Sequence, residues 1–310
     1  MSEEFLLQTN ALTKEFKNVK AVDHVDIKLK RGEIYGLIGR NGAGKTTLLR
    51  MLAGLAKPTE GDYTLFGLSG KKIASLRDRV GVLIEAPGLF SNMTAMQNMK
   101  VKAMALGLKE DDYLRELLDS VGLSSTDKRP VRDYSLGMKQ RLGIAMALVG
   151  HPDLLLLDEP INGLDPEGII EVRDLLAKLS KEQNITILIS SHILEELSKT
   201  ATRFGIINRG RLISEFSREE LLSECKEFLE IRTSDIDTAC TIIDRIGIKD
   251  YKIVDKTTVK IYEKLDEVGK IIAELENNKV KVISADMGHR SLEEYYISLV
   301  DHDDKVTAGS

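Results

Sequence analysis

A glycine-rich segment that ends in a lysine and a threonine could bind phosphate. It reads Gly39-Arg40-Asn41-Gly42-Ala43-Gly44-Lys45-Thr46, with Thr47 next, and lies between an apolar run and a predicted helix. Glycines let backbone N–H groups approach phosphate oxygens without a Cβ in the way, and the helix presents its positive N-terminal end. Lys45 would neutralise β and γ oxygens, and the Thr46 hydroxyl would bind Mg²⁺. The phosphate-binding residues that we expect are Gly39, Asn41, Gly42, Gly44, Lys45, Thr46 and Thr47.

A pair of carboxylates ends a run of four leucines. Leu154 to Leu157 are followed directly by Asp158 and Glu159. Asp158 would hold Mg²⁺ through the water shell of the metal, and Glu159 would polarise the attacking water as general base. Taken alone, the pair could also be an acidic surface patch. Beside the phosphate loop, it predicts hydrolysis of a nucleoside triphosphate.

A histidine follows another apolar run. His192 comes after Ile185–Ser190, separated from it by Ser191. The carboxyl ends of parallel strands form the ligand-binding edge of such sheets, so His192 could donate to the γ-phosphate. A lone histidine can also be structural. Its position at this edge favours a catalytic role, with Glu159 and Lys45 as the other expected catalytic residues.

The apolar runs that carry these groups predict the fold. Four of them are too short for helices and do not alternate: Ile34–Gly39, Val80–Ile84, Leu154–Asp158 and Ile185–Ser190. Strands of a parallel sheet covered on both faces have this composition. Residues 4–9 and 22–29 alternate instead, as in an antiparallel layer. We therefore predict an α/β fold of P-loop NTPase type, with a mostly parallel sheet and an antiparallel β layer.

The remaining patterns divide the chain into domains. A polar helical insertion is expected over about residues 92–140, with helices at Thr94–Leu106 and Glu110–Val121. It lies within a nucleotide-binding domain of residues 1–216. Residues 217–300 alternate strand and helix patterns in an order typical of a small ferredoxin-like α+β domain. This domain is expected to be a packing or regulatory appendage, and residues 301–310 a disordered tail.

Composition excludes several classes of protein. The 310 residues include 44 Lys+Arg and 49 Asp+Glu, a net charge of −5, which gives no indication of a nucleic-acid-binding surface. Cys225 and Cys240 have no metal-site spacing and are expected to be reduced thiols in the cytosol. The most apolar stretch, Leu142–Leu157, is broken by Gly150 to Asp153 and is too interrupted to span a membrane. If the protein acts at a membrane, another polypeptide must cross that membrane.

Three further segments make the chain resemble an ATP-binding-cassette (ABC) ATPase subunit. They are Tyr134-Ser-Leu-Gly-Met-Lys-Gln-Arg141, Asn162-Gly-Leu-Asp165 and Ser190-Ser-His192. The resemblance covers residues 4 to about 216 and implies ATP and Mg²⁺ as cofactors. It also implies a dimer of two copies, in which Ser135 and Gly137 contact ATP on the opposite subunit and Asp165 lies in the loop at the interface. Phe16 would stack on adenine, although an aromatic side chain there could equally belong to the core.

Two departures from the family pattern stand out. The usual signature Leu-Ser-Gly-Gly-Gln has Tyr134, Leu136 and Met138 at three positions, whereas Ser135 and Gly137 are kept. Glu85 stands where the family usually has a glutamine that binds Mg²⁺ and water. We expect Glu85 to bind the nucleotide's metal and to tune its occupancy, because a carboxylate binds Mg²⁺ more strongly than an amide does.

These features are similar to those of bacitracin-resistance and lantibiotic self-immunity exporters of Gram-positive bacteria. The resemblance implies an ATP-hydrolysing subunit at the cytoplasmic face of the cell membrane, which energises export of a peptide antibiotic or another amphipathic compound. A separate membrane permease would be contacted through Ala86–Asn98 and the helical insertion. The alternative is a soluble ABC ATPase that acts on nucleic acid or ribosomes. A non-hydrolysing scaffold conflicts with Glu159.

Overall fold

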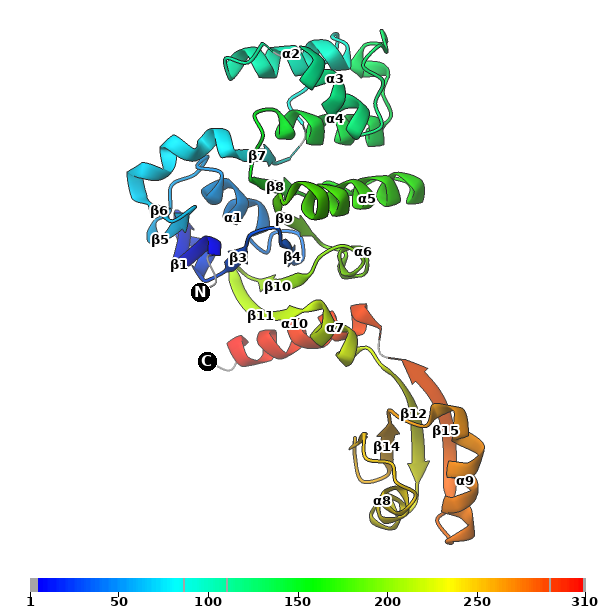
Figure 1. Cartoon of the computed structure of the whole chain (residues 1–310). Helices are drawn as coiled ribbons and strands as arrows, with labels where there is room; N and C mark the ends of the chain where they lie inside the picture. Colours follow the sequence, from blue (N-terminus) through cyan, green and yellow to red (C-terminus); the bar gives the residue numbers. More distant parts are fainter. Residues whose placement is uncertain (1–4, 86, 110, 290, 309–310) are drawn as a thin grey trace. The chain divides into compact units, whose positions relative to one another are not determined.

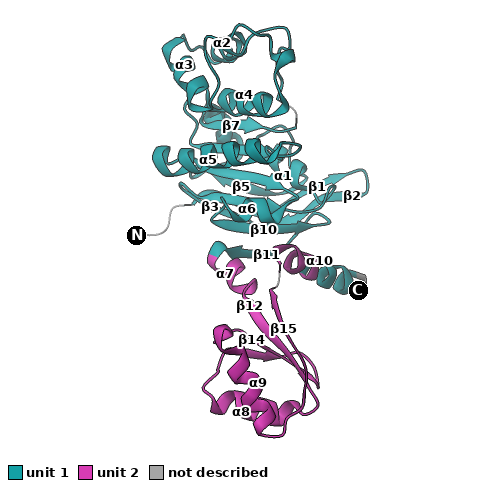
Figure 2. Ribbon diagram, turned by 90° about the vertical axis from the view of Figure 1, so that its right-hand side faces the viewer, with its two compact units in different colours: residues 1–218, 299–310 teal, residues 219–298 magenta. Residues whose placement is uncertain are grey.

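A computed structural model describes residues 5–85, 87–109, 111–289 and 291–308, and it divides into two compact units (Figures 1 and 2). Unit 1 contains residues 1–218 and 299–310, and unit 2 contains residues 219–298. The first residues of two predicted segments, Ala86 and Glu110, lie outside the described residues.

The central sheet of unit 1 is the predicted, mostly parallel sheet. Its order is β11-β10-β4-β9-β8-β7, with β11 antiparallel at one edge and the other five strands parallel. The register places Asp158 opposite Ser190 and Ile38 opposite Ser191. The strands are β4 Ile34–Ile38, β7 Val80–Leu83, β8 Leu154–Asp158, β9 Thr186–Ser191, β10 Arg203–Asn208 and β11 Arg211–Ser217.

The N-terminal strands form the predicted antiparallel layer, in the order β2-β1-β5-β6 with β3 paired to β1. Helices α1 and α5 pack on strands of the central sheet, and α6 follows β9 (Figure 1). The strands of the layer are β1 Phe5–Phe16, β2 Val19–Val25, β3 Lys28–Lys30, β5 Glu60–Leu65 and β6 Leu68–Ser69. The helices are α1 Lys45–Leu52, η1 Gly70–Arg79, α5 Pro166–Gln183 and α6 Leu194–Ser198.

The helical insertion begins at a capped helix. Thr94 accepts from the backbone N–H of Gln97, whose side chain in turn accepts from the backbone of Thr94. This capping box fixes where the helix starts, as the sequence predicts. The insertion comprises α2 Ala95–Ala105, α3 Asp111–Ser120, η2 Val131–Asp133 and α4 Leu136–Leu148, the last of which packs on β7.

Unit 2 has the predicted ferredoxin-like topology. Its antiparallel sheet has the order β13-β14-β12-β15, and α8 and α9 bury their apolar sides against one face of it. Ile242 of α8 and Leu275 of α9 meet Leu229 and Ile231 of β12 in this core. Its elements are α7 Arg218–Glu224, β12 Glu227–Thr233, α8 Ile236–Arg245, β13 Tyr251–Ile253, β14 Thr258–Ile261, η3 Leu265–Glu267, α9 Val268–Asn277 and β15 Val282–His289.

The expectation of a disordered tail over 301–310 is wrong for residues 301–308. Helix α10 runs from Leu292 to Ala308, and residues 309–310 lie outside the described part of the chain. Val300 is fully buried, and Asp303 and Asp304 are hydrogen-bonded to Asn208 at the end of β10. The prediction rested on the position of this stretch at the end of the chain. Its ordering partner, Asn208, lies 95 positions away in the sequence.

Candidate active site

The glycine-rich loop leaves β4 and enters α1 in a conformation that its glycines make possible. Gly44 has a φ of 109°, and a Cβ there would lie 2.3 Å from the carbonyl oxygen of Ala21. A Cβ on Gly39 would lie 2.5 Å from the carbonyl oxygen of Ile207. Close backbone packing behind the loop therefore requires these glycines, whereas Asn41 and Gly42 are exposed on its open side.

Lys45 is buried inside the curve of this loop. Its side chain is 5% exposed, and its Nζ donates to the carbonyl oxygens of Gly39 at 2.6 Å and Arg40 at 3.3 Å. The same Nζ lies 3.2 Å from Oε1 of Glu159. A buried ammonium group is thus held at the centre of the loop, where it can bind an anionic oxygen.

Asp158 connects the phosphate loop to two strand ends. The Thr46 hydroxyl donates to its Oδ2 at 2.7 Å, and the Ser190 hydroxyl donates to its Oδ1 at 2.5 Å. Asp158 is only 6% exposed, so these two bonds fix the direction of its carboxylate. The sequence predicted Thr46 and Asp158 for this site but not Ser190. The signal in the sequence that could have identified Ser190 is its hydroxyl at the end of an apolar strand next to β8.

Glu159 and His192 form a second pair at the same edge of the sheet. Oε2 of Glu159 lies 2.8 Å from Nδ1 of His192, and the Glu159 backbone N–H donates to the Ser190 carbonyl at 3.2 Å. Glu159 has a φ of 49°, a strained value for a side chain of this size. Its Oε1 is buried and accepts no hydrogen bond within the described chain, since the contact with Lys45 lacks hydrogen-bond geometry.

The oxygens present fit Mg²⁺ held together with a nucleotide. Among the described residues no group of three His, Cys, Asp or Glu side chains is placed to hold a metal ion by itself. Mg²⁺ commonly takes one or two protein oxygens and fills its octahedron with phosphate and water. The adjoining oxygens of Thr46 and Asp158 meet that requirement, and the unbonded Oε1 of Glu159 can accept a hydrogen bond from a water molecule.

Glu85 lies in a different arrangement from the one expected. It follows β7 with a φ of 64°, its side chain is 61% exposed, and it is paired with Arg50 of α1. Within the described part of the chain, no hydrogen bond joins Glu85 to Thr46 or Asp158. The sequence did not identify Arg50 as its partner, because 35 positions separate the two residues.

Ser135, Gly137 and Asp165 lie together but apart from the phosphate loop. Ser135 caps α4 by accepting from the Met138 N–H at 3.2 Å, and Asp165 caps α5 by accepting from the Gly168 N–H at 3.1 Å. Leucine side chains lie between the two helix starts: a Cβ on Gly163 would lie 3.1 Å from the Leu136 side chain, and one on Gly137 would lie 3.8 Å from Leu164. No hydrogen bond or ion pair between described residues connects this group to residues 39–47.

Phe16 is available for stacking. It ends β1 opposite Val19 of β2, and half of its surface is exposed. The ammonium group of Lys14 lies 5.0 Å from the centre of its ring. The same hairpin contacts the phosphate loop, because the carbonyl of Ala21 touches Gly44. This exposure excludes the alternative in which Phe16 belongs to the core.

Comparison with known proteins agrees with the resemblance to ABC ATPase subunits that the sequence motifs indicate. The ABC transporter family model matches residues 22–162. The bacitracin transport ATP-binding protein BcrA of Bacillus licheniformis is 42% identical over 297 residues, which is 95% of this chain and 97% of the relative. The chain belongs to the ABC transporter family. The lantibiotic transport ATP-binding protein SrtF of Streptococcus pyogenes is 43% identical over 221 residues, or 71% of this chain and 95% of that protein.

Solved ABC cassettes share the fold. The cbiO1 protein of Clostridium perfringens, part of an ABC transporter complex, aligns with a TM-score of 0.65 at 28% identity, over 79% of this chain and 98% of that one. The dimeric cassette MJ0796, solved with ADP and Pi in a post-hydrolysis state, aligns with a TM-score of 0.62 at 23% identity, over 68% and 98%. As a member of the ABC family, the chain binds ATP and hydrolyses it.

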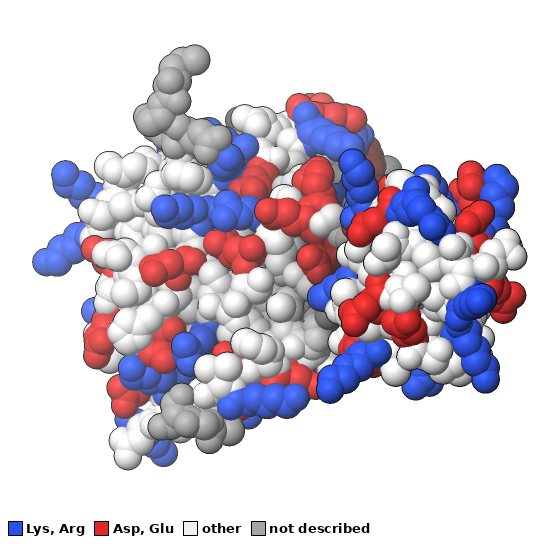
Figure 3. Space-filling model, turned by 90° about the horizontal axis from the view of Figure 1, so that it is seen from below, with Lys and Arg blue, Asp and Glu red and all other residues white. Residues whose placement is uncertain are grey.

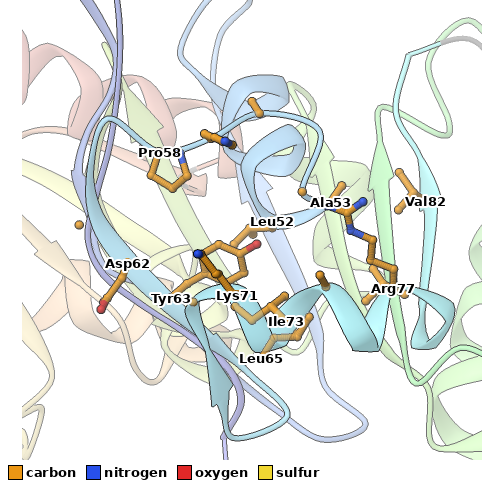
Figure 4. Close-up of a pocket in the computed structure, with 17 residues that line it drawn as sticks. Leu52, Ala53, Pro58, Asp62, Tyr63, Leu65, Lys71, Ile73, Arg77 and Val82 are labelled. Carbon is orange, nitrogen blue, oxygen red and sulfur yellow. The ribbon is translucent and has the colours of Figure 1, made fainter.

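A cavity of about 660 Å³ lies beyond the C-terminal end of α1 in this ABC cassette (Figure 4). Leu52, Tyr63 and Leu65 form part of its apolar lining, and Lys71 and Arg77 come from η1. None of residues 39–47 lines it, so it is separate from the nucleotide site.

No helix in the described ranges is both long and apolar enough to cross a membrane.

Proposed function

We propose that this ABC ATPase energises the export of a peptide antibiotic of bacitracin or lantibiotic type through a separate membrane permease, at the cytoplasmic face of the membrane. The observation that carries the proposal is the convergence of Lys45, Thr46, Asp158 and Glu159 at one sheet edge, in a chain that aligns with a bacitracin transport protein along nearly its whole length. The substrate class comes from the names of these relatives, BcrA and SrtF.

ATP binding would change the partners of the Lys45 ammonium group, which contacts the Gly39 carbonyl and Glu159. The γ-phosphate replaces the Gly39 carbonyl and Glu159 as the partner of the Lys45 ammonium. Thr46 and Asp158 would hold Mg²⁺, which would offset the negative charge on the β and γ oxygens. Backbone N–H groups of the exposed loop side bind the remaining phosphate oxygens.

Hydrolysis then needs a general base, Glu159, and a group that orients this base, His192. Glu159 accepts the proton of the water molecule that attacks the γ-phosphorus, and the bond from that phosphorus to the bridging oxygen of ADP breaks. His192 holds Oε2 of Glu159 and so directs Oε1 at the water. The other ring nitrogen of His192 would donate to the γ-phosphate. Lys45 stabilises the charge that develops during the transfer.

The second half of each site comes from a second copy of the chain. Ser135, Gly137 and Asp165 form a group with its own local hydrogen bonds and with Leu136 half-exposed beside it. In a dimer this group contacts the ATP held by the loop of the other subunit. The dimeric cassette MJ0796 has the same fold, which is compatible with this arrangement.

The permease contacts the cassette through residues 87–98 and the helical insertion. Phe90 in this segment is 51% exposed, a large apolar side chain that a cytoplasmic helix of the permease would cover. Glu85 precedes this segment in the chain and is paired with Arg50 of α1, so this ion pair would couple the permease to α1. Mg²⁺ binding by Glu85 would require this pair to open.

Purification from membranes tests the proposal. The tagged chain, solubilised in detergent, is expected to recover an integral membrane protein, and bacitracin or a lantibiotic is expected to raise the ATPase rate of that complex. Cells that carry Glu159→Gln should lose resistance to the peptide. Recovery of ribosomes or nucleic acid instead would contradict the proposal.

Charges of both signs are interspersed over the face in Figure 3, and this distribution favours neither ribosomes nor nucleic acid as the partner.

A further inference from the structure

The turn between β10 and β11 lies directly behind the phosphate loop. Arg209 and Gly210 both have positive φ, 47° and 82°, as in a tight two-residue hairpin. The Gly210 N–H donates to the carbonyl oxygen of Ala43 at 2.9 Å, and its own carbonyl accepts from the Asp23 N–H at 2.8 Å. The backbone of this turn therefore supports the middle of the loop from the side opposite to the phosphates.

Two carboxylates of α10 hold the same turn from outside. Asn208, which precedes it, is 7% exposed, and its Nδ2 donates to Asp303 at 2.9 Å and to Asp304 at 3.0 Å. Arg209 is paired with Asp304 at 3.2 Å. All of these residues belong to unit 1.

The chemistry of this contact is specific. An amide has two N–H donors, and an ionised carboxylate can only accept, so both donors of Asn208 are satisfied by the two aspartates. Because Asn208 is nearly buried, loss of both acceptors would leave its amide without compensation for the water it gave up. Hydrogen bonds to charged acceptors are also the stronger kind. A single orientation of Asn208, and of the turn attached to it, is thereby selected.

We propose that Asp303 and Asp304 are positioning residues for ATP binding. They hold Asn208, Asn208 fixes the β10–β11 turn, and the turn keeps Ala43 and the loop around it in the phosphate-binding conformation. The first residues of α10, 292–298, belong to unit 2, and its remaining residues belong to unit 1. The proposal depends on ATP binding alone and not on the transported substrate.

The first test compares three purified full-length proteins. The double variant Asp303→Ala/Asp304→Ala is expected to raise the dissociation constant for a fluorescent N-methylanthraniloyl-ATP with Mg²⁺, and the KM for ATP, about tenfold, the size of a charge-assisted hydrogen bond. The kcat should change by less than about twofold, because Glu159 and His192 are untouched. Asp301→Ala is the control: it removes one carboxylate from an exposed position of the same helix, and it should behave as wild type.

A donor–acceptor exchange separates positioning from general stability. Asn208→Asp places three carboxylates together and should weaken ATP binding further than the double alanine variant does. Adding Asp303→Asn and Asp304→Asn returns amide donors to the new carboxylate and should restore most of the affinity. Wild-type affinity in the double alanine variant would overturn the proposal. So would an exchange variant that recovers the melting temperature but not ATP affinity.

Discussion

The two parts of the proposed nucleotide site are built differently. Around the phosphate loop, Lys45 is buried against Glu159, and the hydroxyls of Thr46 and Ser190 hold the buried Asp158. Around Ser135 and Asp165, by contrast, each polar side chain only caps its own helix, and the neighbouring Leu136 is half-exposed. The first part is preorganised within one chain. The second presents its groups outwards, as expected for a surface completed by another subunit.

The largest effect is expected from Glu159→Gln. Removal of the general base should lower the rate of phosphate release by about 10²–10⁴-fold, whereas the isosteric amide leaves the phosphate loop intact and ATP still binds. Phosphate release and nucleotide binding measure the two effects, and gel filtration should detect a dimer trapped with ATP. A variant that kept its rate would remove Glu159 from the mechanism.

Lys45→Ala should abolish tight ATP binding, with an affinity loss of about 100-fold or more. The change removes the only ammonium group placed at the centre of the loop in the described chain, and it leaves the buried Glu159 carboxylate without its cation. Equilibrium binding of N-methylanthraniloyl-ATP measures this. Lys178→Ala is a useful control, since that lysine is exposed on α5. Unchanged affinity in Lys45→Ala would contradict the proposed role of the loop.

Ser135→Ala should lower the ATPase rate about tenfold but leave ATP affinity of the monomer unchanged, because this serine acts on the ATP of the other subunit. Mixing is the sharper test. Dimers that combine a Lys45→Ala subunit with a Ser135→Ala subunit contain one intact composite site, so the mixture should be more active than either variant alone. Ser223→Ala serves as the control, because this serine of unit 2 donates locally, to the Glu220 carbonyl. A mixture without recovery would place Ser135 in its own subunit's site.

The smallest effect is expected from Glu85→Gln. The Glu85–Arg50 pair is largely exposed, and such pairs contribute about 0–1 kcal/mol, so the fold and most ATP hydrolysis of the isolated cassette should be retained. A change of less than about threefold in kcat is expected, and the dependence of the rate on Mg²⁺ concentration is the measurement that isolates the metal. Complete loss of ATPase would mean that Glu85 takes a direct part in the chemistry.

Much of this architecture was predictable from local patterns. The run of four leucines before Asp158 and Glu159 marked β8, and the apolar run before Gly39 marked β4. The helices of the insertion and the order of elements in unit 2 followed from their periodicity and stop signals. Prediction failed at the C-terminus, where the position at the chain end favoured disorder, whereas the buried Val300 and the bond from Asn208 to Asp303 hold the helix.

By itself, the sequence determined which groups can do chemistry, because the spacing of Gly39 to Thr46 and the position of Glu159 after a buried strand are local properties. Only the tertiary structure decided which residues hold those groups. Ser190 directs Asp158, Arg50 holds Glu85, and Asp303 with Asp304 holds Asn208 behind the loop. Hydrogen bonds and ion pairs of this kind join residues 32 to 96 positions apart, and side-chain periodicity carries no information about such pairings.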